Sequence, residues 1–159
     1  MMFRGLLRRR QQLSDGVCVE ILKSEKRGVL SVMGDEGYPY GLPIDHWYCA
    51  ENGKLYFHCG KAGHKLDAIR ACDKVSYCVT DSGTPEDGGW ALYFRSVIVF
   101  GRAKIIEDQA RVIEITRQLS RKFTDDTAYI EDEIRKFAAG TLCIELTPEH
   151  ICGKQIHEA

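Results

Sequence analysis

The chain has 159 residues, a formal net charge of −1 at pH 7 and a 44% share of hydrophobic residues. This length favours one domain, residues 1–159, with a substantial core. The balanced charge excludes the global basic field that attracts nucleic acid or an anionic membrane, so we expect neither as a partner.

The N-terminal arm, residues 1–12, is basic but lacks the apolar region of a secretory signal. No apolar stretch elsewhere reaches the roughly 20 residues that a membrane helix needs. These two observations predict a cytoplasmic protein.

The seven cysteines are odd in number and include no C-x-x-C pair. This spacing disfavours a disulfide framework and a structural zinc site, and it predicts reduced thiols. Asp45, His46 and Cys49 could suggest a metal site, but His46 and Cys49 would lie on opposite faces of a strand. We therefore expect no metal.

The first predicted element is a short amphipathic helix within residues 14–28. Ser14 is a candidate N-cap, and Val17, Ile21 and Leu22 follow at helical spacing. Gly28 is the predicted stop.

Three strands are predicted between residues 29 and 59, because apolar and polar residues alternate there. The first turn is the glycine-containing segment at residues 35–37. The second is Asn52-Gly53, a strong signal for a two-residue hairpin loop. The segment therefore predicts an antiparallel meander.

A helix over residues 64–71 and a strand over residues 74–80 come next, followed by a loop at 81–91. Residues 92–108 are too rich in Val, Ile and Phe for anything but a long extended strand. Gly101 indicates a bulge or bend in that strand, which we expect to be central in the sheet.

Two surface helices are predicted over residues 108–123 and 125–138 from apolar residues at helical spacing. A last strand follows and should end at Pro148. The whole pattern predicts a mainly β fold with peripheral helices, built as a six-stranded antiparallel barrel rather than a doubly wound parallel sheet.

The stretch "LYFHCGKAGHKLDAIRA" joins a strand to a helix and places Lys61, His64 and Lys65 at the helix entry. Free backbone N–H groups and the positive end of the helix dipole favour an anion there, so a phosphate site is one interpretation. Solvated turn residues that only cap the helix are the other. Gly60 and Gly63 are too close together for a Walker A loop, and no dinucleotide-binding fingerprint is present.

Four segments together resemble the FMN-binding split barrels related to pyridoxamine 5′-phosphate oxidase, most closely the nitroimidazole-resistance (Nim-type) branch. They are "GVLSVMGDEGYPYGLPIDHWY", "GKLYFHCGKAGHKLDAIR", "YFRSVIVFGRAKIIED" and "EHICGKQ". The glycine-containing turn followed by His-Lys is the most specific of these features. The resemblance implies a six-stranded antiparallel split β-barrel that forms a homodimer, with FMN at the subunit interface.

The resemblance also implies which residues bind FMN. The phosphate would be held by Gly63, His64 and Lys65, with help from Lys61. The ring and the ribityl chain would lie against strand residues, some of them from the partner subunit: Pro43, Ile44 and Asp45 beside the isoalloxazine, Phe57, His58 and Cys59 flanking ribityl and ring, and Ser96 and Val97 completing the site.

Strand alternation limits these assignments, because His58 and Cys59 point to opposite faces and cannot both touch the ring through their side chains. His58 is the better candidate, and Cys59 contributes backbone or faces the core. His64 or His58 would supply a proton near the substrate as the catalytic group.

The resemblance implies an FMN-dependent oxidoreductase that reduces small acceptors such as nitroimidazole-type nitroaromatics. Pyridoxamine phosphate oxidation is less favoured, because Lys154 and His157 are a weak substitute for the Arg- and His-bearing C-terminal motif of those enzymes. The alternative is a non-catalytic protein that binds or senses flavin, haem or a deazaflavin, with His46 or His58 as the axial ligand of a haem.

Overall fold

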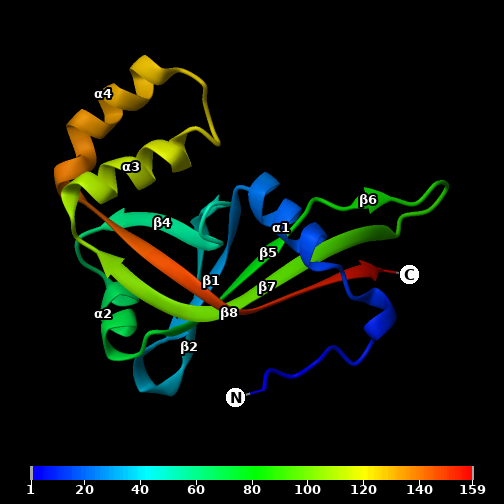
Figure 1. The fold of residues 1–159 in the computed structure, drawn as a ribbon. Coiled ribbons are helices and arrows are strands. Elements are labelled where there is room, and N and C mark those ends of the chain that lie inside the picture. The colour runs from blue at the N-terminus through cyan, green and yellow to red at the C-terminus, as the bar shows by residue number, and fades with distance from the viewer. Residues whose placement is uncertain (1, 159) are drawn as a thin grey trace.

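The computed structural model describes residues 2–158, so Met1 and Ala159, the ends of the predicted domain, lie outside the described part. An eight-stranded antiparallel sheet curls into a half-open barrel, with the order β2-β1-β5-β7-β8-β4-β3 and with β6 paired to β7 (Figure 1). Six strands have seven residues or more: β1 (Arg27–Met33), β2 (Pro39–Asp45), β4 (Lys54–Gly60), β5 (Lys74–Thr80), β7 (Leu92–Ile106) and β8 (Thr141–His157).

The two other strands are the short β3 (Trp47–Cys49) and β6 (Thr84–Pro85). The six long strands therefore confirm the predicted split β-barrel, and β7 is central in the strand order, as expected. The loop predicted at residues 81–91 contains β6, whose two residues pair with the start of β7.

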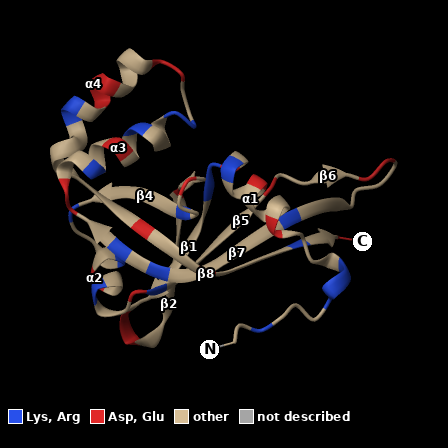
Figure 2. Ribbon diagram, in the orientation of Figure 1, with Lys and Arg blue, Asp and Glu red and all other residues tan. Residues whose placement is uncertain are grey.

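Four α-helices surround the barrel: α1 (Asp15–Ser24), α2 (His64–Ala71), α3 (Gln109–Ser120) and α4 (Thr127–Phe137), with short 3₁₀ turns η1 (Arg9–Gln11), η2 (Asp35–Gly37) and η3 (Ala138–Gly140). α3 and α4 form a hairpin at one end of the barrel, and α2 lies below β4 (Figure 1). Lys and Arg alternate with Asp and Glu along the helices, while the strands are mostly uncharged (Figure 2).

The barrel interior is the main core. Alternate residues of each strand point inward, as in β4, where Leu55 and Phe57 are fully buried. Helix α1 closes one side of the barrel with Ile21 and Leu22. Ser14 accepts a hydrogen bond from the Val17 N–H at 3.3 Å, which confirms it as the N-cap of α1.

Gly28 does not stop the first helix, which ends at Ser24; it lies inside β1. A Cβ atom on Gly28 would be 2.5 Å from the Cys78 carbonyl oxygen and 2.7 Å from the ring of Tyr77. Glycine is therefore required by a tertiary contact with β5, and not by the end of a helix.

Pro148 does not end the last strand either, since β8 continues to His157. Pro148 pairs with Gly101 where the register of β7 and β8 shifts, and this irregularity confirms the bulge predicted at Gly101. Proline is tolerated here because a bulge does not require its missing N–H. A Cβ on Gly101 would be 2.2 Å from the Thr147 oxygen.

The N-terminal arm lies along β7 and β8. Phe3 stacks on His150 with ring centroids 4.8 Å apart and lies 5.6 Å from the ring of Phe100. Gln12 makes an isolated bridge to Lys154. Within the described residues, no helix is both long enough and apolar enough to cross a membrane.

Candidate functional site

The entry of helix α2 presents unused backbone donors. Gly63 is the N-cap at φ = 137°, a conformation that favours glycine, and it offers no side-chain cap. Its carbonyl accepts from the N–H groups of Leu66 and Asp67, while the N–H groups of His64 and Lys65 have no acceptor among residues 2–158. The helix entry can therefore donate two hydrogen bonds to an anion.

Two lysines add positive charge at the same place. Neither Lys61 nor Lys65 forms an ion pair with any described carboxylate. Lys65 is half-buried, and its charge partly offsets the effect of burial, which raises the pKa of the Cys59 thiol. These cations have no anionic partner among residues 2–158, as expected for an anion site.

His64 is turned toward the η2 turn. Its ring stacks on Tyr40 with centroids 4.3 Å apart, and its Nε2 atom accepts from the Asp35 N–H at 3.3 Å. A neutral ring that accepts at Nε2 carries its proton on Nδ1. The Nδ1–H group makes no hydrogen bond within the described chain, so it is available to a ligand at the helix entry.

The strands β2 and β4 meet close to this helix entry without pairing in the sheet order. Asp45, at the end of β2, is held by Arg27, whose Nε donates to Oδ1 at 2.6 Å. His58 of β4 is exposed on the same side. Partial loss of hydration lowers the pKa of His58, and the charge of Lys65 acts in the same direction while Asp45 opposes both. The structure thus brings Asp45, His58 and Lys65 together where β2 and β4 meet. We call this place the seam.

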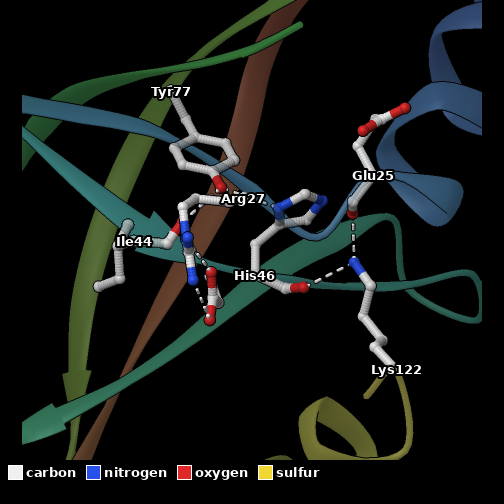
Figure 3. Close-up of polar contacts among 7 residues, drawn as sticks. Glu25, Arg27, Ile44, His46, Tyr77 and Lys122 are labelled. Atoms are coloured by element: carbon white, nitrogen blue, oxygen red, sulfur yellow. Dashed lines mark hydrogen bonds and ion pairs between the residues drawn. The ribbon is translucent and has the colours of Figure 1, made fainter. Parts of the chain in front are cut away.

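A buried polar network fixes the end of β2, directly after Asp45 (Figure 3). The side chain of His46 is fully buried; its Nε2 lies 2.7 Å from the Leu22 oxygen and its Nδ1 2.8 Å from the Tyr77 hydroxyl. That hydroxyl also lies 2.9 Å from the Ile44 oxygen. A carbonyl only accepts, so His46 Nε2 carries a proton and donates it to Leu22, and the single proton of the Tyr77 hydroxyl is shared between two acceptors, the Ile44 oxygen and Nδ1 of the neutral His46 ring.

The ionisation of this network is set by burial. Desolvation lowers the pKa of His46 to about 4, and the nearby charge of Lys122 adds to that effect. Desolvation also lowers the pKa of Lys122 to about 8. The Lys122 amine donates to the carbonyl oxygens of Glu25 and His46, the latter at 2.8 Å (Figure 3). Both ring nitrogens of His46 are already engaged in hydrogen bonds, with Tyr77 and with Leu22. His46 is therefore not placed to ligate a haem.

A cavity of about 330 Å³ opens on the other side of the seam, between the sheet and the α3–α4 hairpin. Asp45 and His58 line the end of the cavity that belongs to the sheet. The helices contribute a mainly apolar wall that includes Leu119, Ile130 and Ile134. The candidate anion site and an apolar cavity thus lie on either side of His58.

Several strand residues predicted for the site point into the core instead. Phe57 is fully buried and meets Tyr77 edge to face, with centroids 4.9 Å apart. Ile44 and Cys59 pack against the same core, as predicted for Cys59. Pro43 stays exposed on β2. Phe57, Ile44 and Cys59 can reach a ligand in the seam through the backbone, and not through a freely exposed side chain.

Ser96 and Val97 are not brought to the seam within one chain. Both lie on β7, which is separated from β4 by β8 and from β2 by β5 and β1. The side chain of Val97 is fully buried in the barrel core, which leaves only its backbone for binding. A contribution of these residues to the same site would have to come from a partner subunit.

Sequence reasoning missed the two arrangements on either side of Asp45. The buried network depends on backbone oxygens of Leu22 and Glu25, which no side-chain pattern reveals. The sequence does hold a signal for the cavity, because Phe123 and Phe137 continue the apolar spacing of the two helices. In the structure these two side chains remain 46% and 61% exposed. No group of three potential metal ligands is found among residues 2–158.

The family model described as pyridoxamine 5′-phosphate oxidase matches residues 14–155. This chain belongs to the pyridoxamine 5′-phosphate oxidase family. The match includes the helix entry, the seam and the cavity. No curated protein matches the chain in sequence.

Solved structures with the same fold include a candidate 5-nitroimidazole antibiotic resistance protein from Bacteroides thetaiotaomicron. It has a TM-score of 0.77 and 16% identity, over 92% of this chain and 87% of that one. An FAD and heme binding protein from Mycobacterium smegmatis has a TM-score of 0.73 and 20% identity, over 94% and 74%. An FAD-binding protein from Mesorhizobium loti has a TM-score of 0.65 and 22% identity, over 92% and 97%. The fold is therefore that of flavin-binding split barrels.

The residues at the seam fit a phosphorylated flavin. The helix entry offers a phosphate N–H donors and two lysines that have no partner among the described residues. The seam adds the backbone of β2 and the His58 side chain for a flat ring with a polar edge.

Proposed function

We propose that this protein is an FMN-dependent oxidoreductase that passes electrons to small acceptors, including nitroimidazole-type nitroaromatics. The observation that carries the proposal is the α2 entry, where two lysines and two backbone N–H donors have no partner in the part of the chain that the structure describes. A phosphate monoester is the anion that such a site suits best. The family and the flavin-binding neighbours support the choice of a flavin.

In this proposal Lys61, Lys65 and the N–H groups of His64 and Lys65 bind the phosphate. The Nδ1–H of His64 donates to the same anion, since the contact with Asp35 fixes the tautomer. His64 therefore binds and orients rather than supplying a catalytic proton.

His58 is the better placed candidate for proton transfer. It lies between the helix entry and the cavity, and partial loss of hydration lowers its pKa, which favours the neutral ring. His58 can therefore exchange a proton with a substrate through a bound water. A bound flavin would supply the electron transfer itself. The chain's own part is to bind, orient and exclude water.

The proposed assembly is a homodimer with the flavin at the interface. The outward face of β1 supports it, since Val29 and Met33 are 43% and 49% exposed there. Val29, Cys78, Ile98 and Cys152 pair in register across four strands, which gives an apolar row on one face. A monomeric mass in solution at full flavin occupancy would contradict the shared site.

Pyridoxamine phosphate oxidation is less well supported. His157, near the C-terminus, stacks on Tyr93 with centroids 4.2 Å apart and pairs with Glu86 at 3.1 Å. It is therefore engaged within its own chain and is not free to grip a substrate phosphate.

The test is the absorption spectrum of the freshly purified protein, with the released cofactor identified by mass. We expect a flavin spectrum that bleaches with NAD(P)H and recovers when a nitroaromatic compound is added. Flavin that resists reduction would indicate a passive binding protein. A Soret band, with His58 as the available histidine ligand, would indicate haem.

A further inference from the structure

The cavity between the seam and the α3–α4 hairpin has its own chemical character. Its lining includes two acidic residues, Asp45 and Glu133, and no lysine or arginine. Among residues 2–158, His58 is the only basic side chain that lines it, and partial loss of hydration lowers the pKa of that ring. The remaining walls are apolar or carry hydroxyl groups.

The charges nearest to the cavity do not help an anion to bind there. Arg27 donates to both carboxylate oxygens of Asp45, so this pair is close to neutral. On the helix side, the Glu133 carboxylate pairs with Lys136 of the same helix. The distance from Lys136 Nζ to Glu133 Oε1 is 3.4 Å, and Lys136 lies on the outer surface. Lys65 and Lys122 lie near His58 and Asp45 but do not line the cavity. An anion entering the cavity would therefore lose water without gaining a cation in direct contact, whereas an uncharged ligand would not bear that cost.

The aromatic residues of the cavity wall favour a flat ligand. Tyr129 and Phe137 line the cavity, and they are 55% and 61% exposed. A planar ring inserted between the helices would cover part of this apolar surface. The volume of about 330 Å³ is at the small end of the range for ligand cavities.

One polar group in the wall lacks a proper partner. The Thr116 hydroxyl oxygen is buried and makes no hydrogen bond within the described part of the chain. Its polar neighbour is the Cys143 thiol, a weak partner whose pKa is raised to about 12 by burial. Thr116 also lines the cavity, so a rotation of its side chain would bring the hydroxyl to a ligand, where a nitro or carbonyl oxygen would satisfy it.

We propose that this cavity is the binding site for an uncharged, flat aromatic electron acceptor and that it discriminates against anionic compounds, phosphorylated ones included. Naming the ligand as the electron acceptor rests on the flavin-dependent function proposed above. The binding preference itself rests only on the cavity.

Three matched probes test the preference: 4-nitrobenzyl alcohol, 4-nitrobenzylamine and 4-nitrobenzoate. They differ in charge and little in shape. Binding to the full chain as purified is followed by shifts of backbone amide NMR signals. We expect the alcohol to bind most tightly and the benzoate roughly 10-fold or more weakly, with the largest shifts at residues of α3 and α4. Equal or tighter binding of the benzoate would overturn the proposal.

Two variants locate the effect. T116V removes a hydroxyl that bonds to nothing strong in the protein, so the fold is retained, and we expect the alcohol to bind about 3- to 10-fold more weakly. T147V changes an exposed threonine of β8 and should leave binding unchanged. Equal binding by T116V and the parent would refute the cavity as the binding site.

E133Q removes a wall carboxylate and should strengthen benzoate binding about threefold, with little effect on the alcohol. E20Q is the matched control, because Glu20 is an exposed helical acid that also pairs with a lysine three residues away. An identical response of both variants would contradict a local effect of Glu133.

The same probes separate this inference from the proposed function. If the protein binds no flavin but keeps the ranking of the three probes, the oxidoreductase proposal fails and the cavity assignment stands. If the flavin is bound and turns over all three probes with equal KM, the cavity assignment fails and the oxidoreductase proposal stands.

Discussion

The network around His46 and the entry of helix α2 both gather polar groups near the seam of β2 and β4, but they differ in how many of those groups have partners. Both ring nitrogens of His46 are used, and the Lys122 amine donates to two carbonyl oxygens. At the helix entry, two lysines and two N–H groups have no partner among the described residues.

This difference indicates two separate tasks. A buried polar group with all its bonds made stabilises one arrangement of the backbone, and here that arrangement positions Asp45 and the end of β2. Exposed donors without partners add nothing to folding, but they are ready for a ligand. Changes to the His46 network should therefore alter stability, and changes to the helix entry should alter ligand binding.

The largest expected effect is the response of the His46 network to acid. The folded pKa of His46, about 4, is below the usual 6.5, so the unfolded chain binds a proton that the folded chain excludes. The resulting stability is complete above pH 6.5 and falls as the pH drops toward 4, by about 3 kcal/mol in total.

Urea unfolding at pH 7 and at pH 4.5 measures this loss. The variant H46Q should be less stable at pH 7 and should show a smaller change between the two pH values than the parent. An unchanged pH dependence in H46Q would show that His46 is not the responsible group.

The second prediction concerns the helix entry. The double variant K61A/K65A removes two cations that would make charge-assisted hydrogen bonds to a phosphate, so FMN affinity should fall roughly 10- to 100-fold. The free energy of unfolding without flavin should change little. Quenching of flavin fluorescence measures the affinity.

The control for that variant is K23A/K136A, which removes two surface lysines outside the helix entry. It should bind FMN as tightly as the parent. Comparable losses in both double variants would point to a general charge effect and not to a built phosphate site.

The third prediction is a smaller change in the buried network. Y77F leaves His46 Nδ1 buried without its donor, which should cost about 2 kcal/mol of unfolding free energy in urea at pH 7. FMN affinity should change by less than about twofold, since the helix entry is untouched. A large loss of affinity with normal stability would contradict the separation of tasks.

The smallest expected effect on stability is at the start of helix α1. The last turn of this helix supplies the Leu22 carbonyl that bonds to His46. S14A removes the N-cap contact to Val17 and should lower the unfolding free energy by about 1 kcal/mol. Flavin binding should be unchanged. A thermal melt with and without FMN checks both points.

Local patterns in the sequence predict much of this fold. The strand at residues 92–106 and the helix at 64–71 are visible from composition and spacing alone. Gly28 and Pro148 are not interpreted correctly in this way, because their roles depend on Tyr77 and Gly101, which pack against them from other strands. Glycine and proline respond to tertiary contacts as well as to local turns.

The candidate site likewise has a part that the sequence predicts and parts that it does not. The helix entry is predictable because its lysines and glycine lie within a few residues of each other. The His46 network is not, since it combines a strand, a helix terminus and Lys122 from the turn that follows α3. The cavity depends on how α3 and α4 pack against β4, which a sequence alone does not fix.

The central claim is that the α2 entry holds the phosphate of a flavin. The most direct test titrates the flavin-free protein with FMN and with riboflavin, which differ only in that phosphate. We predict that FMN binds at least about 10-fold more tightly than riboflavin. Equal affinity for the two flavins would contradict the claim.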